Sequence, residues 1–281
     1  MSTSQRAARV HLVSGGFPRG GSAGHDIDYA RLRILQILQE DVGVATSVAS
    51  DFADIEGWLE RSDTLVTYVA GPFPDDDQAQ GIAEWLESGG RWLALHGTSG
   101  GRAVPIPDSP GRMMSKARHH EVLGAFFLNH PPIRKFQVDV SDRDHPLTRG
   151  LPESFEVMDE LYLVELAAPD ESRVLLTTSD LDAENLAPRT FGFSYGEDTS
   201  VGSDGKTRVL GFVRERGAGA VAYIALGHCH SPTTNIQPFV DESVDPAGTT
   251  PLHFRGPWQT QAFSQLLRNG LEWGCQARRE N

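Results

Sequence analysis

The chain has 281 residues, a hydrophobic fraction of 39% and a formal net charge of −13, with a pI near 5.2. A surface this acidic on average repels nucleic acid and anionic membranes, and no apolar stretch approaches the ~20 residues needed to span a bilayer. The N-terminus lacks the apolar segment of a signal peptide, and two cysteines are too few for a disulfide framework. We therefore expect a cytoplasmic protein with no nucleic-acid or membrane partner.

Up to Gly100, apolar strand-like segments alternate with segments of helical spacing. Strands are expected over residues 10–14, 42–48, 63–70 and 91–95. Helices are expected from Asp26 onward, over residues 52–61 and over residues 77–88. This alternation is typical of an α/β fold with a doubly wound parallel sheet.

Beyond Gly100 the pattern is less regular. Residues 103–112 have the composition of a Pro- and Gly-rich loop, and a helix is expected over 117–126. Strands are expected over 136–140, 156–166, 173–178, 190–194 and 208–214, as an antiparallel β excursion attached to the main sheet.

The chain then returns to the pattern of its first half. A buried parallel-type strand is expected over 220–226, followed by a polar loop over 231–256 and an amphipathic helix over 258–273. That helix can pack into the core or form a subunit interface, so self-association stays open. Without repeats or an evident linker, residues 8–275 are predicted to form a single domain.

Three histidines follow predicted strands. His96 ends the segment Arg91–Leu95 and precedes a glycine, His228 follows the late strand, and His25 lies in the loop after the first strand. In an open α/β sheet the ligand crevice lies beyond the carboxyl ends of the strands. Because imidazole exchanges protons near neutral pH, their convergence predicts a functional site.

The segment Asp159-Glu160-Leu161-Tyr162 supplies the candidate carboxylate. Consecutive residues of a strand point to opposite faces, so one acid is expected to face the crevice and the other the solvent. Asp159 is the expected inward residue, because it shares its side of the alternation with Val157 and Leu161.

A metal site is the alternative interpretation of the histidines. The run His228-Cys229-His230 could supply ligands together with His96 and His25, and zinc accepts nitrogen and sulfur donors. The pair His119-His120 fits the surface of a helix, with His120 as the member able to face the crevice.

Five segments in order resemble the ThuA-like (trehalose utilisation) family of the class I glutamine amidotransferase-like superfamily. These segments are Ala94-Leu95-His96-Gly97, residues 124–131 ending in His130-Pro131, residues 145–152 (His-Pro-Leu-Thr-Arg-Gly-Leu-Pro), Asp159 to Tyr162, and the strand leading to Gly227-His228. The resemblance implies a flavodoxin-like fold and a role in sugar catabolism, with oxidised (3-keto) glycosides as candidate substrates. The superfamily's amidotransferases carry a nucleophilic cysteine after the corresponding strand; here that turn is His96-Gly97-Thr98-Ser99.

These observations predict an enzyme that acts on a glycoside or keto-sugar by histidine and carboxylate acid–base chemistry, through isomerisation or through eliminative or hydrolytic cleavage. The predicted catalytic residues are His96, Asp159 and His228; the predicted substrate contacts are His25, Gly97, Thr98, Ser99, His120, His130, Glu160 and Tyr162. No cofactor is expected, and a divalent metal is kept as the alternative. The alternative functions are a non-catalytic sugar-binding protein and a metal-assisted hydrolase.

Overall fold

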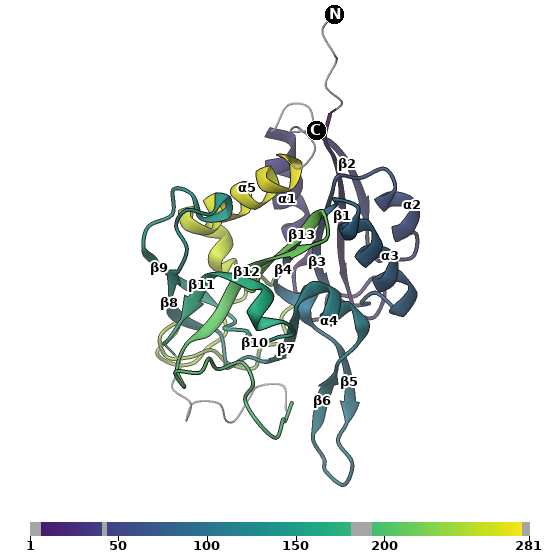
Figure 1. The fold of residues 1–281 in the computed structure, drawn as a ribbon. Helices are drawn as coiled ribbons and strands as arrows, with labels where there is room; N and C mark the ends of the chain where they lie inside the picture. Colours follow the sequence, from purple (N-terminus) through teal and green to yellow (C-terminus); the bar gives the residue numbers. More distant parts are fainter. Residues whose placement is uncertain (1–6, 41–43, 181–192, 277–281) are drawn as a thin grey trace, which may run out of the picture.

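A computed structural model describes residues 7–40, 44–180 and 193–276. Its centre is a nine-stranded mixed sheet (Figure 1). From one edge, five parallel strands follow in the order β2 (Ala45–Ala49), β1 (Arg9–Gly16), β3 (Thr64–Ala70), β4 (Arg91–Leu95) and β13 (Gly219–Ile224). Four antiparallel strands complete it in the order β12 (Arg208–Arg216), β11 (Ser172–Thr178), β8 (Arg134–Val140) and β9 (Ser154–Asp159). The predicted α/β class, parallel sheet and antiparallel excursion are confirmed.

The helices form two groups, one on each side of the sheet. Right-handed crossovers place α1 (Ile27–Glu40) on the face opposite α2 (Ile55–Leu59) and α3 (Asp76–Glu87), because the chain reverses direction across the sheet after β2. The C-terminal α5 (Gln261–Gln276) packs beside α1, and the short α4 (Arg118–Leu123) beside α3 (Figure 1). The switch in strand order lies between β1 and β3, where α/β proteins of this topology bind ligands.

The central strands have the burial that their apolar sequences predict. Every residue of β13 is buried, as are all residues of β4 except Arg91. Strands covered by helices on both faces have near-continuous apolar runs rather than alternation. One hydrophobic cluster includes side chains from β1 through to α5 and contains both halves of the sheet.

Two smaller sheets depart from the sequence expectations. Residues 103–112, expected as a loop, belong to a hairpin of β5 (Arg102–Pro105) and β6 (Arg112–Ser115), which projects from the body (Figure 1). Only the tip of the hairpin is a turn. Its prolines and glycines give the whole segment the composition of a loop, so the short flanking strands are not predicted from the sequence. The helix expected over 117–126 ends at Leu123, because Gly124 adopts a φ of +89° and caps it; β7 (Ala125–Asn129) follows directly.

The strand expected over 156–166 is interrupted. β9 ends at Asp159, and β10 (Leu163–Leu166) pairs with β7 in a separate sheet. The three residues between them, Glu160 to Tyr162, belong to neither sheet. The strand expected over 190–194 lies mostly outside the described residues, as does the start of the one expected over 42–48.

Across the described ranges, none of the helices combines the length and apolar character needed to cross a membrane.

The backbone of Gly15 lies so close to the backbone of Ser50 that no side chain fits between them. A Cβ at Gly15 would lie 1.9 Å from the Ser50 carbonyl oxygen, whereas a Cβ at Gly57, within α2, would meet no atom within 4 Å. We expect Gly15→Ala to lower the free energy of unfolding by about 2 kcal/mol or more, as overpacking does. Gly57→Ala should raise it by about 0.5–1 kcal/mol, because alanine favours a helix interior. Urea denaturation measures both, and equal effects would contradict the close approach.

Candidate functional site

Three histidines meet at the carboxyl edge of the parallel strands. His25 lies in the loop between β1 and α1, His96 directly follows β4, and His228 follows β13. The Nε2 atoms of His25 and His96 are 3.1 Å apart, and the His228 ring centroid lies 5.0 Å from that of His25. The three rings therefore lie together at one edge of the sheet, as the sequence predicts, because parallel strands end at the same edge.

His96 is held rigidly at the centre of this edge. Its φ of +45° turns the backbone sharply as β4 ends, a conformation that costs a non-glycine residue roughly 1–2 kcal/mol. Its Nδ1 donates to the Ala225 carbonyl at 2.7 Å, and the Tyr162 ring stacks on it with centroids 4.1 Å apart. The surrounding structure therefore stabilises an otherwise unfavourable backbone and fixes the direction of the imidazole.

A buried carboxylate, that of Glu160, lies among these rings. Its side chain is 2% exposed. One oxygen, Oε2, lies 3.3 Å from His96 Nε2 and 3.9 Å from His25 Nε2. The other, Oε1, lies 3.2 Å from His228 Nδ1 and 3.5 Å from His130 Nε2. The cluster thus joins Glu160 to four imidazoles from four separate segments.

The expectation that Asp159 faces the pocket is wrong. Its carboxylate accepts hydrogen bonds from the backbone N–H groups of Gly227 (2.8 Å), His228 (2.9 Å) and Glu160 (2.9 Å). The alternation argument fails because β9 ends at Asp159, so the next residue is not bound by the pleat. Neither acid faces solvent either, since both side chains are buried.

Asp159 instead acts as an anchor for the loop that carries His228. We expect Asp159→Ala to lower the free energy of unfolding by about 3 kcal/mol or more, because it leaves three buried N–H groups without their acceptor. Glu156→Gln is the matched control on the same strand, at a side chain that is 61% exposed and paired with Lys135, and it should change stability by less than about 0.5 kcal/mol. Urea denaturation compares them, and an Asp159→Ala variant as stable as the control would contradict the anchor.

A cavity of about 200 Å³ opens beside the cluster. His25, His130 and Glu160 contribute to its wall, and aromatic rings form much of the rest. Its lining residues are Ala23, Gly24, His25, Ala70, Phe73, Gly97, Gly100, Gly101, Met114, Phe127, His130, Glu160, Tyr162, Phe193, Ile236 and Gln237. The cavity therefore combines a buried charged group with apolar surfaces.

Several predicted contacts do line this cavity and others do not. Gly97 and Tyr162 are among its lining residues. Thr98 donates its hydroxyl hydrogen to the Leu95 carbonyl, and the Ser99 hydroxyl pairs with that of Tyr223 at 2.7 Å. His120 donates from Nε2 to the Gly100 carbonyl at 2.9 Å, which places it behind the wall.

The pair His119-His120 is also buried rather than on a helix surface. Each side chain is 2% exposed, and both Nε2 atoms contact the Gly100 carbonyl. Phe73 stacks on His119 and Phe126 lies against His120, contacts that the local sequence does not reveal.

Gln237 is a polar cavity residue that the sequence gave no reason to choose. It lies in the long polar loop before α5, and its amide Nε2 donates to Glu160 Oε1. No periodicity or motif marks it, because its position depends on how the loop folds over the cavity. His230, by contrast, lies next to the cluster: its Nδ1 is 3.0 Å from His228 Nε2.

Burial and mutual contact shift the ionisation of the cluster. Burial lowers the pKa of His25 to about 3 and also lowers the pKa values of His130 and His228. Burial acts to raise the pKa of Glu160, but the surrounding histidines outweigh it and hold that pKa well below its usual range. Burial acts to lower the pKa of His96, yet Glu160 and Asp159 outweigh it, so the pKa of His96 is raised.

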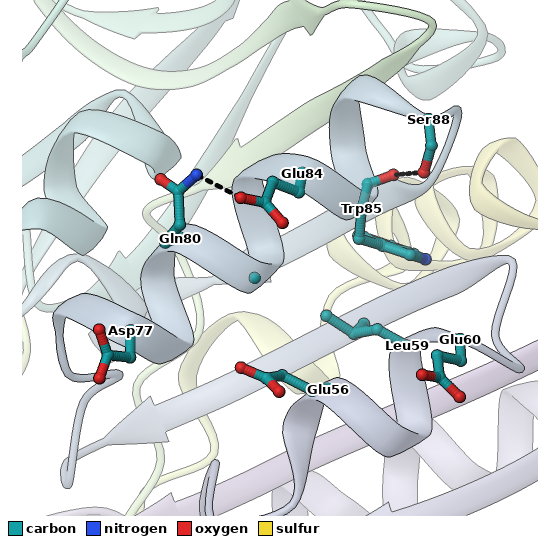
Figure 2. A pocket seen from close by; sticks show the side chains of 9 residues that line it. Glu56, Leu59, Glu60, Asp77, Gln80, Glu84, Trp85 and Ser88 are labelled. Atoms are coloured by element: carbon teal, nitrogen blue, oxygen red, sulfur yellow. Dashed lines mark hydrogen bonds between the residues drawn. The ribbon is translucent and has the colours of Figure 1, made fainter.

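A wider hollow of about 630 Å³ lies elsewhere, between α2 and α3 (Figure 2). Its charged groups are exposed carboxylates, those of Glu56, Glu60, Asp77 and Glu84. Exposed acids of this kind on helix surfaces are solvated. The smaller cavity, with its buried convergent groups, is the candidate site.

Comparison with known proteins decides the family. A family profile described as ThuA, trehalose utilisation, matches residues 19–241. The chain belongs to the ThuA family. Four of the five segments that carry the resemblance supply His96, His130, Glu160 and His228 to the cluster. The fifth packs against α5, where Asn269 donates to the Leu147 and Arg149 carbonyls.

Solved structures share this ThuA fold at low sequence identity. A ThuA-like protein of Bacteroides uniformis aligns at a TM-score of 0.62 and 16% identity, covering 100% of this chain and 96% of its own. A ThuA-like protein of Parabacteroides merdae aligns at 0.56 and 17%, covering 95% and 90%. A β-galactosidase of Rahnella sp. R3 aligns at 0.55 and 14%, covering 97% of this chain but 32% of its own. No curated protein matches the sequence significantly.

Proposed function

We propose that this ThuA-family protein is an enzyme of sugar metabolism that acts on a glycoside or keto-sugar at the Glu160–histidine cluster. The observation that carries the proposal is a buried carboxylate in contact with imidazoles at the wall of a cavity. Buried charge is costly and is found where it is needed for binding or chemistry. The family's description, trehalose utilisation, supports a sugar as the ligand.

The cavity suits a small ligand with both apolar and hydroxyl-bearing faces. Its volume of about 200 Å³ lies below the range of about 300–1,000 Å³ usual for drug-sized ligands, which favours a single sugar unit. Phe73, Phe127 and Tyr162 contribute aromatic surface for the C–H side of a sugar. Glu160, His25 and His130 offer hydrogen-bond acceptors for its hydroxyl groups, since the Nδ1 atoms of both imidazoles donate to backbone carbonyls.

Proton transfer is the reaction type that these side chains support. A carbonyl acidifies the neighbouring C–H bond, so a base can remove that proton while an acid protonates the enolate or the departing oxygen. Isomerisation and eliminative cleavage both follow this scheme. Hydrolysis by two flanking carboxylates is less well supported, because Glu160 is the one acid among the described cavity-lining residues, and Asp159 is occupied by backbone N–H groups.

Turnover by a Glu160→Gln variant tests the proposal. We expect conversion of a substrate, found by screening ordinary and 3-keto glycosides with the parent protein, to fall about 100- to 10,000-fold, because the amide cannot exchange the proton. Glu156→Gln is the surface control and should keep parental activity. Binding of a sugar without conversion by the parent would identify a binding protein instead. Activity of Glu160→Gln within a few-fold of the parent would remove Glu160 from the chemistry.

His96→Gln gives a second, independent measurement. The glutamine amide fills a similar volume but cannot exchange a proton near neutral pH, so we expect a loss of kcat of about 100-fold or more. Circular dichroism and a thermal melt would establish that the variant is folded. Near-parental kcat in a folded His96→Gln protein would show that this ring only positions Tyr162 and its neighbours.

A further inference from the structure

Backbone carbonyls fix the tautomers of two cluster histidines. His25 Nδ1 lies 2.8 Å from the Ala23 carbonyl, and His96 Nδ1 lies 2.7 Å from the Ala225 carbonyl. A carbonyl oxygen only accepts hydrogen bonds, so each Nδ1 must carry its hydrogen. In the neutral rings, Nε2 is therefore an unprotonated nitrogen that points toward the partner histidine, only 3.1 Å away.

A longer relay fixes the third ring, that of His228. His230 Nε2 lies 2.8 Å from the Pro251 carbonyl and must donate to it, which leaves His230 Nδ1 as an acceptor. His228 Nε2 then donates to that Nδ1 at 3.0 Å. The remaining nitrogen, His228 Nδ1, is unprotonated and lies 3.2 Å from Glu160 Oε1.

When all three rings are neutral, four electron-rich atoms converge at this point. His25 Nε2, His96 Nε2, His228 Nδ1 and a Glu160 oxygen all lie within 4.8 Å of one another, and all four residues are buried. Within the described ranges, Glu160 Oε2 and His228 Nδ1 are buried without a hydrogen-bond partner. Unpartnered acceptors held together in a dry interior repel one another and lose their hydration, so this arrangement calls for a cation.

The shortest separations are close to those in the coordination shell of a small divalent ion, and all of them stay within 4.8 Å. Neighbouring atoms of the set lie 3.1, 3.3 and 3.9 Å apart. Ligands bound tetrahedrally at the 2.0–2.1 Å typical of zinc would be about 3.3 Å apart. The hydrogen bonds from the far side of each imidazole to a carbonyl or to His230 are the outer contacts that orient metal-binding histidines.

We propose that His25, His96, His228 and Glu160 bind one divalent transition-metal ion of the zinc class. This inference deepens the proposed function, since it rests on the same site and names its cofactor. Three imidazoles and one carboxylate favour Zn²⁺ and its transition-metal neighbours over Mg²⁺ and Ca²⁺, which prefer oxygen ligands. Because His25 and Glu160 line the cavity, the ion would be within reach of a sugar oxygen.

Cys229 and His230 are not ligands in this arrangement. The Cys229 thiol lies 3.6 Å from the Tyr68 hydroxyl and 3.5 Å from the Asp26 carbonyl oxygen. His230 uses both ring nitrogens in the relay to His228. The tertiary structure thus replaces the ligand run expected from His228-Cys229-His230 with a set drawn from four segments.

Metal binding by the full chain, without any substrate, tests the inference. After EDTA treatment and dialysis, we expect titration calorimetry and elemental analysis to show one equivalent of Zn²⁺ per chain, a raised melting temperature, and no binding of Mg²⁺ at the same concentration. His25→Ala and Glu160→Gln should each weaken Zn²⁺ binding more than about 100-fold, since even an outer contact is typically worth 10- to 100-fold. His253→Gln, at an exposed histidine, is the matched control and should bind like the parent.

Three results would overturn the metal site. These are a parent protein that binds no stoichiometric Zn²⁺, binding that survives both ligand substitutions, and equal binding of Mg²⁺. The first would mean that a proton on His96 holds the cluster together. If a variant fails to fold, the absorption spectrum of the Co²⁺-loaded parent decides instead: visible bands of a low-symmetry nitrogen–oxygen site are expected, and the weak spectrum of aqueous Co²⁺ would count against the site.

The two proposals can fail separately. Stoichiometric Zn²⁺ together with no turnover of any sugar would leave the metal site standing and remove the enzyme. Turnover that is identical in metal-free and metal-loaded protein would support the enzyme and remove the ion from its chemistry.

Discussion

The structure of the site depends on the hydrogen bonds between the Asp159 carboxylate and the backbone of Gly227 and His228. β9 lies four strands away from β13 in the sheet order, which in a flat sheet would separate them by about 19 Å. The Asp159 carboxylate at the end of β9 nevertheless lies 2.8 Å from the N–H of Gly227, so the twist of the sheet and the loop after β13 together bring these segments into contact. Because Glu160 is the next residue, the same hydrogen bonds also place its carboxylate among the histidines.

The residues of the site come from segments spread along the whole chain. His25, His96 and His228 come from the parallel half, Glu160 and Tyr162 from the link between β9 and β10, and Gln237 from the loop before α5. None of these segments could form the cluster alone, since each supplies one or two groups. The site is therefore complete only when the antiparallel excursion has folded.

Electrostatics then determines what the assembled site can do. Removing a carboxylate from water is expensive, and Glu160 contacts four imidazoles through its two oxygens, of which only His96 has a raised pKa and can supply a compensating proton. Three of those imidazoles have lowered pKa values, because burial disfavours their charged form, and so they face the carboxylate as acceptors. The cluster holds one negative charge among electron-rich nitrogens, an arrangement suited to receive a cation or a proton beside a sugar-sized cavity.

The amino-acid sequence by itself determined the α/β class, the alternation of strands and helices, the antiparallel excursion and the family. It also placed His25, His96 and His228 at one edge, because each follows a strand and parallel strands end together. Only the tertiary structure decided that Glu160 rather than Asp159 enters the cluster, that Thr98, Ser99 and His120 turn away from the cavity, and that Gln237 reaches it. The physical reason is that local patterns describe residues within regular elements, whereas these side chains lie where elements end, and there their directions are set by long-range hydrogen bonds.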